Sequence, residues 1–80
     1  MNLQILLFGI STDLVGETAL SFSLSPSSSV LQLKEQLQNQ YPQLSQINSY
    51  AIAVNEEYAT DETTLKENDI VAIIPPVSGG

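Results

Sequence analysis

The sequence predicts an α+β fold in which one mixed β-sheet curls around a single main helix. Three observations support this prediction. Two apolar segments lie near opposite ends of the chain, at residues 3–10 and 70–74. Residues 18–25 alternate between apolar and polar side chains, which is typical of a half-exposed strand. Residues 30–44 instead repeat apolar side chains every three or four positions, which is typical of a helix with one apolar face.

The first two strands are expected to form a hairpin. Residues 3–10 are apolar on both alternating faces, as expected of a central strand that is covered on two sides. The connection at residues 11–16 is expected to contain one helical turn. In the strand at residues 18–25, apolar side chains such as Leu20 and Phe22 face one way and serines face the other.

The main helix is predicted to begin after Ser29 and to end near Tyr41. Ser29 followed by Gln32 fits a capping box, in which each side chain binds the backbone N–H of the other residue. Pro42 disfavours helical geometry at the residue before it. The apolar stripe expected to pack against the sheet consists of Val30, Leu33, Leu37, Tyr41 and Leu44.

Two longer strands are expected after the helix, at residues 50–54 and 70–74, with a short extended piece at 58–59 between them. Asn68 is expected to adopt a left-handed turn conformation, which asparagine tolerates better than most residues. The first and last strands are both apolar on two faces, so we expect them to be central and to pair in parallel. The segment between them then forms a right-handed crossover. This layout is that of a β-grasp domain.

The composition excludes several classes of function. The 80 residues contain neither cysteine nor histidine, and nine acidic side chains against two lysines give a net charge of −7. The usual zinc and iron–sulfur ligands and a thiolate nucleophile are therefore missing, and we predict no metal site. No glycine-rich phosphate loop is present, so no bound cofactor is predicted.

The charge also bears on partners and location. With only Lys34 and Lys66 as cations, the chain cannot build the basic patch that binds nucleic acid, and an anionic membrane surface is disfavoured. A basic protein partner is the natural complement. The apolar run at residues 5–10 is far shorter than the roughly 20 residues that span a bilayer, and no leader pattern precedes it. We therefore expect a soluble cytoplasmic protein.

The end of the chain is the segment best suited to chemistry. Residues 1–74 are expected to form the β-grasp domain, and residues 75–80 a flexible tail. The tail consists of Pro75, Pro76, Val77, Ser78, Gly79 and Gly80. The two prolines lack an N–H group, so they stop the last strand and favour an extended exit.

The rest of the tail suits insertion into a partner. Val77 is a candidate anchor for an apolar groove, and Gly79 and Gly80 can pass through a narrow channel because they carry no side chain. A free carboxylate at Gly80 is a poor acyl donor. It would need activation by a partner that uses ATP.

Four segments of the chain are similar to segments of a known protein family. They are residues 5–9, the Tyr41-Pro42 helix exit, residues 53–58 and residues 65–80, which end in Pro-Pro-Val-Ser-Gly-Gly. With these segments the chain resembles the small subunits of molybdopterin synthase, which are ubiquitin-like β-grasp sulfur carriers. The resemblance covers most of the chain. Two departures are Asn68, where the family usually has glycine, and the absence of arginine.

The resemblance implies a mechanism centred on Gly80. An adenylyltransferase related to ubiquitin-activating enzymes would adenylate its carboxylate, and a sulfurtransferase would supply sulfur to form a thiocarboxylate. The tail would insert into the large subunit of molybdopterin synthase, in a heterotetramer of two small and two large subunits. There the sulfur would pass to the cyclic pyranopterin precursor of the molybdenum cofactor. The chain would be the sulfur-donating subunit of this complex and not catalytic alone.

Two alternatives remain open at this point. One is a sulfur carrier for thiamine-thiazole synthesis or tRNA thiolation, against which the Pro-Pro-Val-Ser segment argues. The other is a ubiquitin-like protein modifier or a plain interaction domain, although two lysines limit chain building. A free-standing enzyme is disfavoured, because its candidate carboxylates are expected to be solvated in turns. These are Asp61, Glu62, Glu67 and Asp69.

Overall fold

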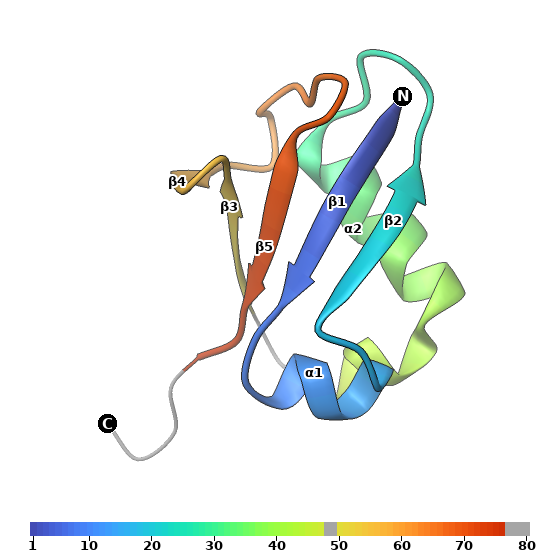
Figure 1. The fold of residues 1–80 in the computed structure, drawn as a ribbon, viewed down its shortest axis with the longest axis vertical. Helices are drawn as coiled ribbons and strands as arrows, with labels where there is room; N and C mark the ends of the chain where they lie inside the picture. Colours follow the sequence, from blue (N-terminus) through green and yellow to red (C-terminus); the bar gives the residue numbers. More distant parts are fainter. Residues whose placement is uncertain (48–49, 77–80) are drawn as a thin grey trace.

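The fold was described from a computed structural model, which places residues 1–47 and 50–76. In chain order its elements are β1 (Asn2–Leu7), α1 (Ile10–Val15), β2 (Ala19–Ser23), α2 (Val30–Gln40), the 3-10 helix η1 (Pro42–Gln46), β3 (Ala51–Val54), β4 (Glu57–Ala59) and β5 (Ile70–Ile74). The strands form one sheet in the order β2-β1-β5-β3-β4 (Figure 1). Most elements begin and end close to the residues predicted for them.

The sheet is mixed, as the sequence predicts. β1 and β5 are parallel, with Gln4 opposite Ile70 and Leu7 opposite Ile73. β2 pairs antiparallel with β1, and β3 pairs antiparallel with both β5 and β4. The predicted hairpin, the parallel pairing of the first and last strands and their central position are therefore confirmed. β1 and β5 run toward the same end of the sheet, where α1 lies (Figure 1).

The hydrophobic core lies between α2 and one face of the sheet. In Figure 1, α2 crosses behind the strands. Its predicted apolar stripe is confirmed, since Val30, Leu33, Leu37 and Leu44 are fully buried and Tyr41 packs at the edge of the core. Full burial of one such aliphatic side chain stabilises the fold by about 1.5–3 kcal/mol. This packing holds α2 against the sheet.

The prediction that the two central strands are covered on both faces is wrong. Along β1, Leu3, Ile5 and Leu7 are buried, whereas Gln4 is exposed and Leu6 is half-buried. β5 shows the same alternation. The physical reason is that α2 covers one face, and no described helix covers the other (Figure 1). The apolar residues on the second face are thus left partly open to solvent.

The first strand is also shorter than predicted. It ends at Leu7, and Ile10 already belongs to α1. The turn between them depends on Gly9, whose φ of 56° and ψ of −136° lie in a region that glycine adopts readily. The apolar character of Phe8 and Ile10 hid this turn in the sequence, and both side chains are about half exposed, at 49% and 51%.

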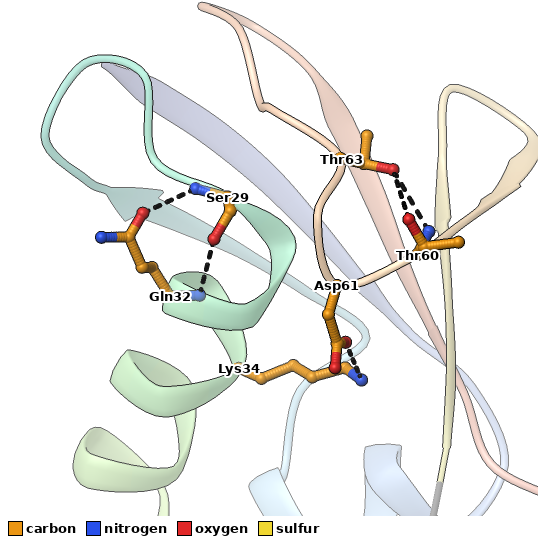
Figure 2. A network of polar contacts seen from close by, with 6 residues as sticks. All are labelled: Ser29, Gln32, Lys34, Thr60, Asp61 and Thr63. Carbon is orange, nitrogen blue, oxygen red and sulfur yellow. Dashed lines mark hydrogen bonds and ion pairs between the residues drawn. The ribbon is translucent and has the colours of Figure 1, made fainter.

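The N-terminus of α2 carries the predicted capping box (Figure 2). The Gln32 N–H donates to Ser29 Oγ over 3.3 Å, and the Ser29 N–H donates to Gln32 Oε1 over 2.8 Å. At the other end, the Tyr41 N–H donates to the Leu37 carbonyl over 2.7 Å. Pro42 then begins η1, so the predicted effect of proline on the helix end is confirmed.

The loop between β4 and β5 binds the N-terminal end of α2. The Val30 N–H donates to the Thr63 carbonyl over 2.9 Å, and the Leu31 N–H donates to the Asp61 carbonyl over 3.1 Å. Lys34 Nζ forms an ion pair with Asp61 Oδ1 at 2.8 Å (Figure 2). Two helix N–H groups that have no partner within the helix thus find one in the loop.

Candidate functional site

The predicted tail begins where the structure ends the last strand. β5 ends at Ile74, and Pro75 and Pro76 follow it without regular structure, so the prediction that the prolines stop the strand is confirmed. Pro75 is half-buried and Pro76 is exposed. The other predicted tail residues, Val77, Ser78, Gly79 and Gly80, lie outside the described residues. Their roles, including that of Gly80 as the acyl site, stay predictions.

Pro75 lies against the turn that follows β1. A Cβ atom built on Gly9 would be 3.6 Å from Pro75 Cγ, so the glycine backbone and the proline ring are close neighbours. The contact lies at the end of the sheet where α1 begins. The base of the tail therefore lies close beside the turn that follows β1.

Two hydroxyl side chains build the junction between β1 and α1. The Phe8 N–H donates to Ser11 Oγ over 3.1 Å, and the Ser11 hydroxyl donates to the Phe8 carbonyl over 2.5 Å. The Thr12 hydroxyl donates to the Leu7 carbonyl over 2.9 Å. Ser11 is fully buried. The sequence reasoning missed these residues, although a serine and a threonine just after a glycine are a recognised mark of a turn.

The face of the sheet opposite α2 carries no charged side chain on its strands. Directly paired residues point to the same face, which gives one row across the sheet made of Ala19, Leu6, Ala72, Ala53 and Tyr58. Glu57 is the single charged residue within the strands, and it pairs with Val54, which packs on the core. We call this uncharged side of the sheet the open face.

Large apolar side chains are exposed on or beside the open face. Tyr58 is 77% exposed, Ile70 on β5 is 43% exposed, and Phe8 directly after β1 is 49% exposed. Acidic residues flank the strands instead, with Glu17 before β2 and Glu56 in the turn between β3 and β4. An apolar surface without charge at its centre and with charge around it is typical of a protein–protein interface.

One of the acidic residues expected in solvated turns is buried. Asp69 is only 8% exposed, and its carboxylate accepts hydrogen bonds from Asn55 Nδ2 over 2.9 Å and from the Lys66 N–H over 2.8 Å. Asn55 Oδ1 accepts from the Ile70 N–H over 3.0 Å. Asp69 therefore fixes the turn that leads into β5, and its expected solvation is wrong.

The other candidate carboxylates are exposed, as expected. Asp61 pairs with Lys34, Glu67 accepts a hydrogen bond from the Asn2 N–H over 3.1 Å, and Glu62 is exposed in its turn. Within residues 1–47 and 50–76, no group of three or more histidine, cysteine or acidic side chains could hold a metal ion. In the same part of the chain, none of the helices is long and apolar enough to cross a membrane.

Comparison with known proteins confirms the fold. The small archaeal modifier protein SAMP1 from Haloferax volcanii superimposes with a TM-score of 0.90 at 21% identity, over 100% of both chains. A chain in the protein–protein complex of subunits 1 and 2 of the molybdopterin-converting factor from Helicobacter pylori superimposes with a TM-score of 0.72 at 25% identity, again over 100% of both chains. The predicted β-grasp architecture is therefore correct.

Comparison of sequences gives the family. The molybdopterin synthase sulfur carrier subunit of Dictyostelium discoideum is 37% identical over 81 residues, which cover 96% of this chain and 94% of that protein. The profile of the ThiS family matches residues 5–80, from β1 through the tail. The chain belongs to the ThiS family.

Proposed function

We propose that this chain is the sulfur-carrier small subunit of molybdopterin synthase. The observation that carries the proposal is a match along nearly the whole chain to a relative of that name, at 37% identity. The match to the ThiS family includes the tail, since it extends to residue 80. The domain of residues 1–74 presents the tail of residues 75–80, and the reactive group is the Gly80 carboxylate.

The proposed chemistry takes place on the tail and uses the catalytic groups of partners. An adenylyltransferase joins the Gly80 carboxylate to AMP from ATP and releases pyrophosphate. The outer sulfur of a sulfurtransferase persulfide then attacks the acyl-adenylate and displaces AMP. A reducing thiol cleaves the resulting acyl disulfide and leaves the thiocarboxylate. This sulfur passes to the cyclic pyranopterin precursor inside the large subunit. The role needs no cysteine or histidine on the carrier, and the chain has neither.

The structure supports the tail as the reactive part of the chain. Pro75 and Pro76 follow β5 directly, and neither can extend the sheet with an N–H group. The two glycines at the end offer the least steric resistance to a narrow active-site channel. Four to six extended residues reach roughly 13–20 Å, enough to enter a pocket in another protein.

The open face supports docking on a partner subunit. It combines exposed apolar residues such as Tyr58 and Ile70 with the absence of charged strand residues on this face, and it adjoins the end of β5. The similar Helicobacter pylori chain comes from a complex of subunits 1 and 2 of the molybdopterin-converting factor. We propose that the open face docks on the large subunit, in a heterotetramer of two small and two large subunits. The net charge of −7 favours a partner with basic residues around the contact.

The alternative functions share the tail and differ in the acceptor. A carrier for thiamine-thiazole synthesis or tRNA thiolation would form the same thiocarboxylate, and a protein modifier would form an isopeptide with a lysine. Neither is favoured by the relative that matches nearly the whole chain, which is a molybdopterin synthase subunit. The likeness to SAMP1, at 21% identity, is evidence for the fold alone.

Intact mass spectrometry tests the proposal. The chain is incubated with its adenylyltransferase, ATP and a sulfurtransferase with its sulfur source. We expect a mass gain equal to one sulfur replacing one oxygen, and its loss when the large subunit and pyranopterin precursor are added. A chain that lacks Gly80 serves as the control and should show no gain. No gain on the full chain, or the same gain on the control, would contradict the proposal.

A further inference from the structure

The hydrogen-bond ladder between β1 and β5 stops at the level where the tail begins. The Gln4 N–H donates to the Asp69 carbonyl over 3.1 Å, and Gln4 pairs with Ile70. In a parallel ladder one residue bonds to both neighbours of its partner, and this pattern repeats every two residues. Continued to Phe8, it would place the Phe8 carbonyl opposite the nitrogen of Pro75. That nitrogen carries no hydrogen, so the ladder cannot continue there.

Ser11 takes over both backbone groups of Phe8 at this point. Its hydroxyl accepts from the Phe8 N–H over 3.1 Å and donates to the Phe8 carbonyl over 2.5 Å. The Ser11 N–H also donates to the same carbonyl, over 3.2 Å. Ser11 is fully buried, whereas its partner Phe8 is about half exposed. One side chain thus binds both backbone groups of Phe8, including the carbonyl that Pro75 leaves without a donor.

The turn held by Ser11 is the surface against which Pro75 packs. Phe8 leads into Gly9 at φ 56°, and the Pro75 ring lies beside its Cα, because a Cβ atom built there would be 3.6 Å from Pro75 Cγ. The neighbouring Thr12 hydroxyl holds the Leu7 carbonyl over 2.9 Å, which fixes the turn from its other side. The direction of the chain at Pro75 therefore depends on the position of the turn from Phe8 to Gly9.

We propose that Ser11 is a positioning residue for the chemistry of the tail. By ending the β1–β5 ladder and holding the turn at Gly9, it seats Pro75 and sets the direction in which the tail leaves the domain. The role assigned to Ser11 is exerted through Pro75, and Ser11 is given no part in the reaction at the Gly80 carboxylate. This inference rests on the proposed function for its catalytic consequence, whereas the seating of Pro75 can be tested without it.

Ser28 provides a matched control for Ser11. It is 6% exposed, and its hydroxyl donates to the carbonyl three residues earlier, at Ser25, over 2.7 Å, just as Ser11 donates to Phe8. Ser28 lies in the loop between β2 and α2, and that loop is at the opposite end of the sheet from α1 (Figure 1). Both substitutions therefore remove a bond from a buried hydroxyl to a carbonyl three residues earlier. Ser11→Ala also removes the acceptor of the Phe8 N–H, and only Ser11 is next to the base of the tail.

The first measurement is the steady-state rate at which the adenylyltransferase, with ATP and the sulfur source, converts each variant to the thiocarboxylate. We expect Ser11→Ala to lower kcat roughly tenfold with little change in KM, because a misdirected tail still docks but reaches the active site poorly. Ser28→Ala should keep the kcat of the unchanged chain. Pro75→Ala removes the ring itself, and we expect it to lower kcat as much as Ser11→Ala does. This second variant keeps the test valid if Ser11→Ala folds poorly.

The second measurement is the nuclear Overhauser contact between Gly9 and the Pro75 ring. We expect it in the unchanged chain and in Ser28→Ala, and we expect its loss in Ser11→Ala. Persistence of the contact in Ser11→Ala, or an equal fall in kcat for both serine variants, would overturn the inference. If the unchanged chain is never converted, the proposed function fails. The Overhauser contact then still decides whether Ser11 seats Pro75.

Discussion

Among residues 1–47 and 50–76, four residues other than glycine hold a positive φ, and each lies in a turn. Asn55 and Glu56 form the turn between β3 and β4 at φ 52° and 72°, and Asn68 and Ser27 adopt φ values of 67° and 66°. A two-residue turn with positive φ at both positions matches the twist of the flanking strands. Asparagine tolerates this conformation, which confirms the prediction for Asn68. Glutamate pays a steric cost for it.

Glu56→Gly is expected to stabilise the domain by about 1 kcal/mol, because glycine adopts φ 72° without the clash of a Cβ atom. Urea denaturation measures the free energy of unfolding. Glu62→Gly is the control, since it removes the same charge from an exposed turn residue whose φ is not positive. A gain in stability for Glu62→Gly as large as that for Glu56→Gly would mean that charge, and not φ, is responsible.

At the scale of elements, α2 is defined by local sequence and is then fixed by a distant loop. The capping box of Ser29 and Gln32 needs only residues that are close in the chain, and the sequence predicted it. The bonds from the first turn of the helix to Thr63 and Asp61 come from the loop before β5. Only the folded chain brings this loop and the helix together, so residue patterns did not indicate these bonds.

Ser29→Ala is expected to lower the free energy of unfolding by about 1 kcal/mol, because the Gln32 N–H loses its acceptor at the helix start. Thermal and urea unfolding followed by circular dichroism measure the change. Ser21→Ala is the control, since Ser21 is exposed on an edge strand of the open face. Equal losses for the two variants would show that the capping box adds no specific stability.

The end of β1 shows where residue patterns were insufficient. Phe8 and Ile10 continue the apolar run, so alternation alone extended the strand through them. The chain turns instead at Gly9, and Ser11 bonds back to Phe8. The deciding factor is the end of the β1–β5 ladder at Pro75. Since Pro75 is far from β1 in the sequence, the boundary depends on tertiary pairing.

At the scale of the whole molecule, charge and apolar surface are separated. The open face carries no charged strand residue, and the acidic residues lie in turns, in loops and on the helices, apart from Glu57 on β4, which pairs with Val54 on the other face. The sequence indicated an acidic protein with a basic partner. It did not locate the contact surface, because the apolar residues of the central strands were assigned to a second buried face.

Tyr58→Ala is expected to weaken binding to the large subunit of molybdopterin synthase roughly tenfold, since exposed aromatic residues often dominate an interface. Isothermal titration calorimetry measures the affinity. Leu31→Ala is the matched control, because Leu31 is an apolar residue of α2 with 46% exposure, on the other side of the sheet. Unchanged affinity for Tyr58→Ala, or an equal loss for Leu31→Ala, would contradict docking through the open face.

The sequence by itself determined the local structure, the β-grasp order of elements and the chemical character of the tail. Helix caps, prolines and residue periodicity depend on residues that are close in the chain. The absence of cysteine and histidine is a matter of composition. Both kinds of feature are therefore visible in the sequence. The tertiary structure decided which face of the sheet stays open, where β1 ends and why Asp69 is buried. These features depend on a single helix that covers one face and on contacts between residues far apart in the chain. The contacts that stabilise these features exist only once the sheet has formed.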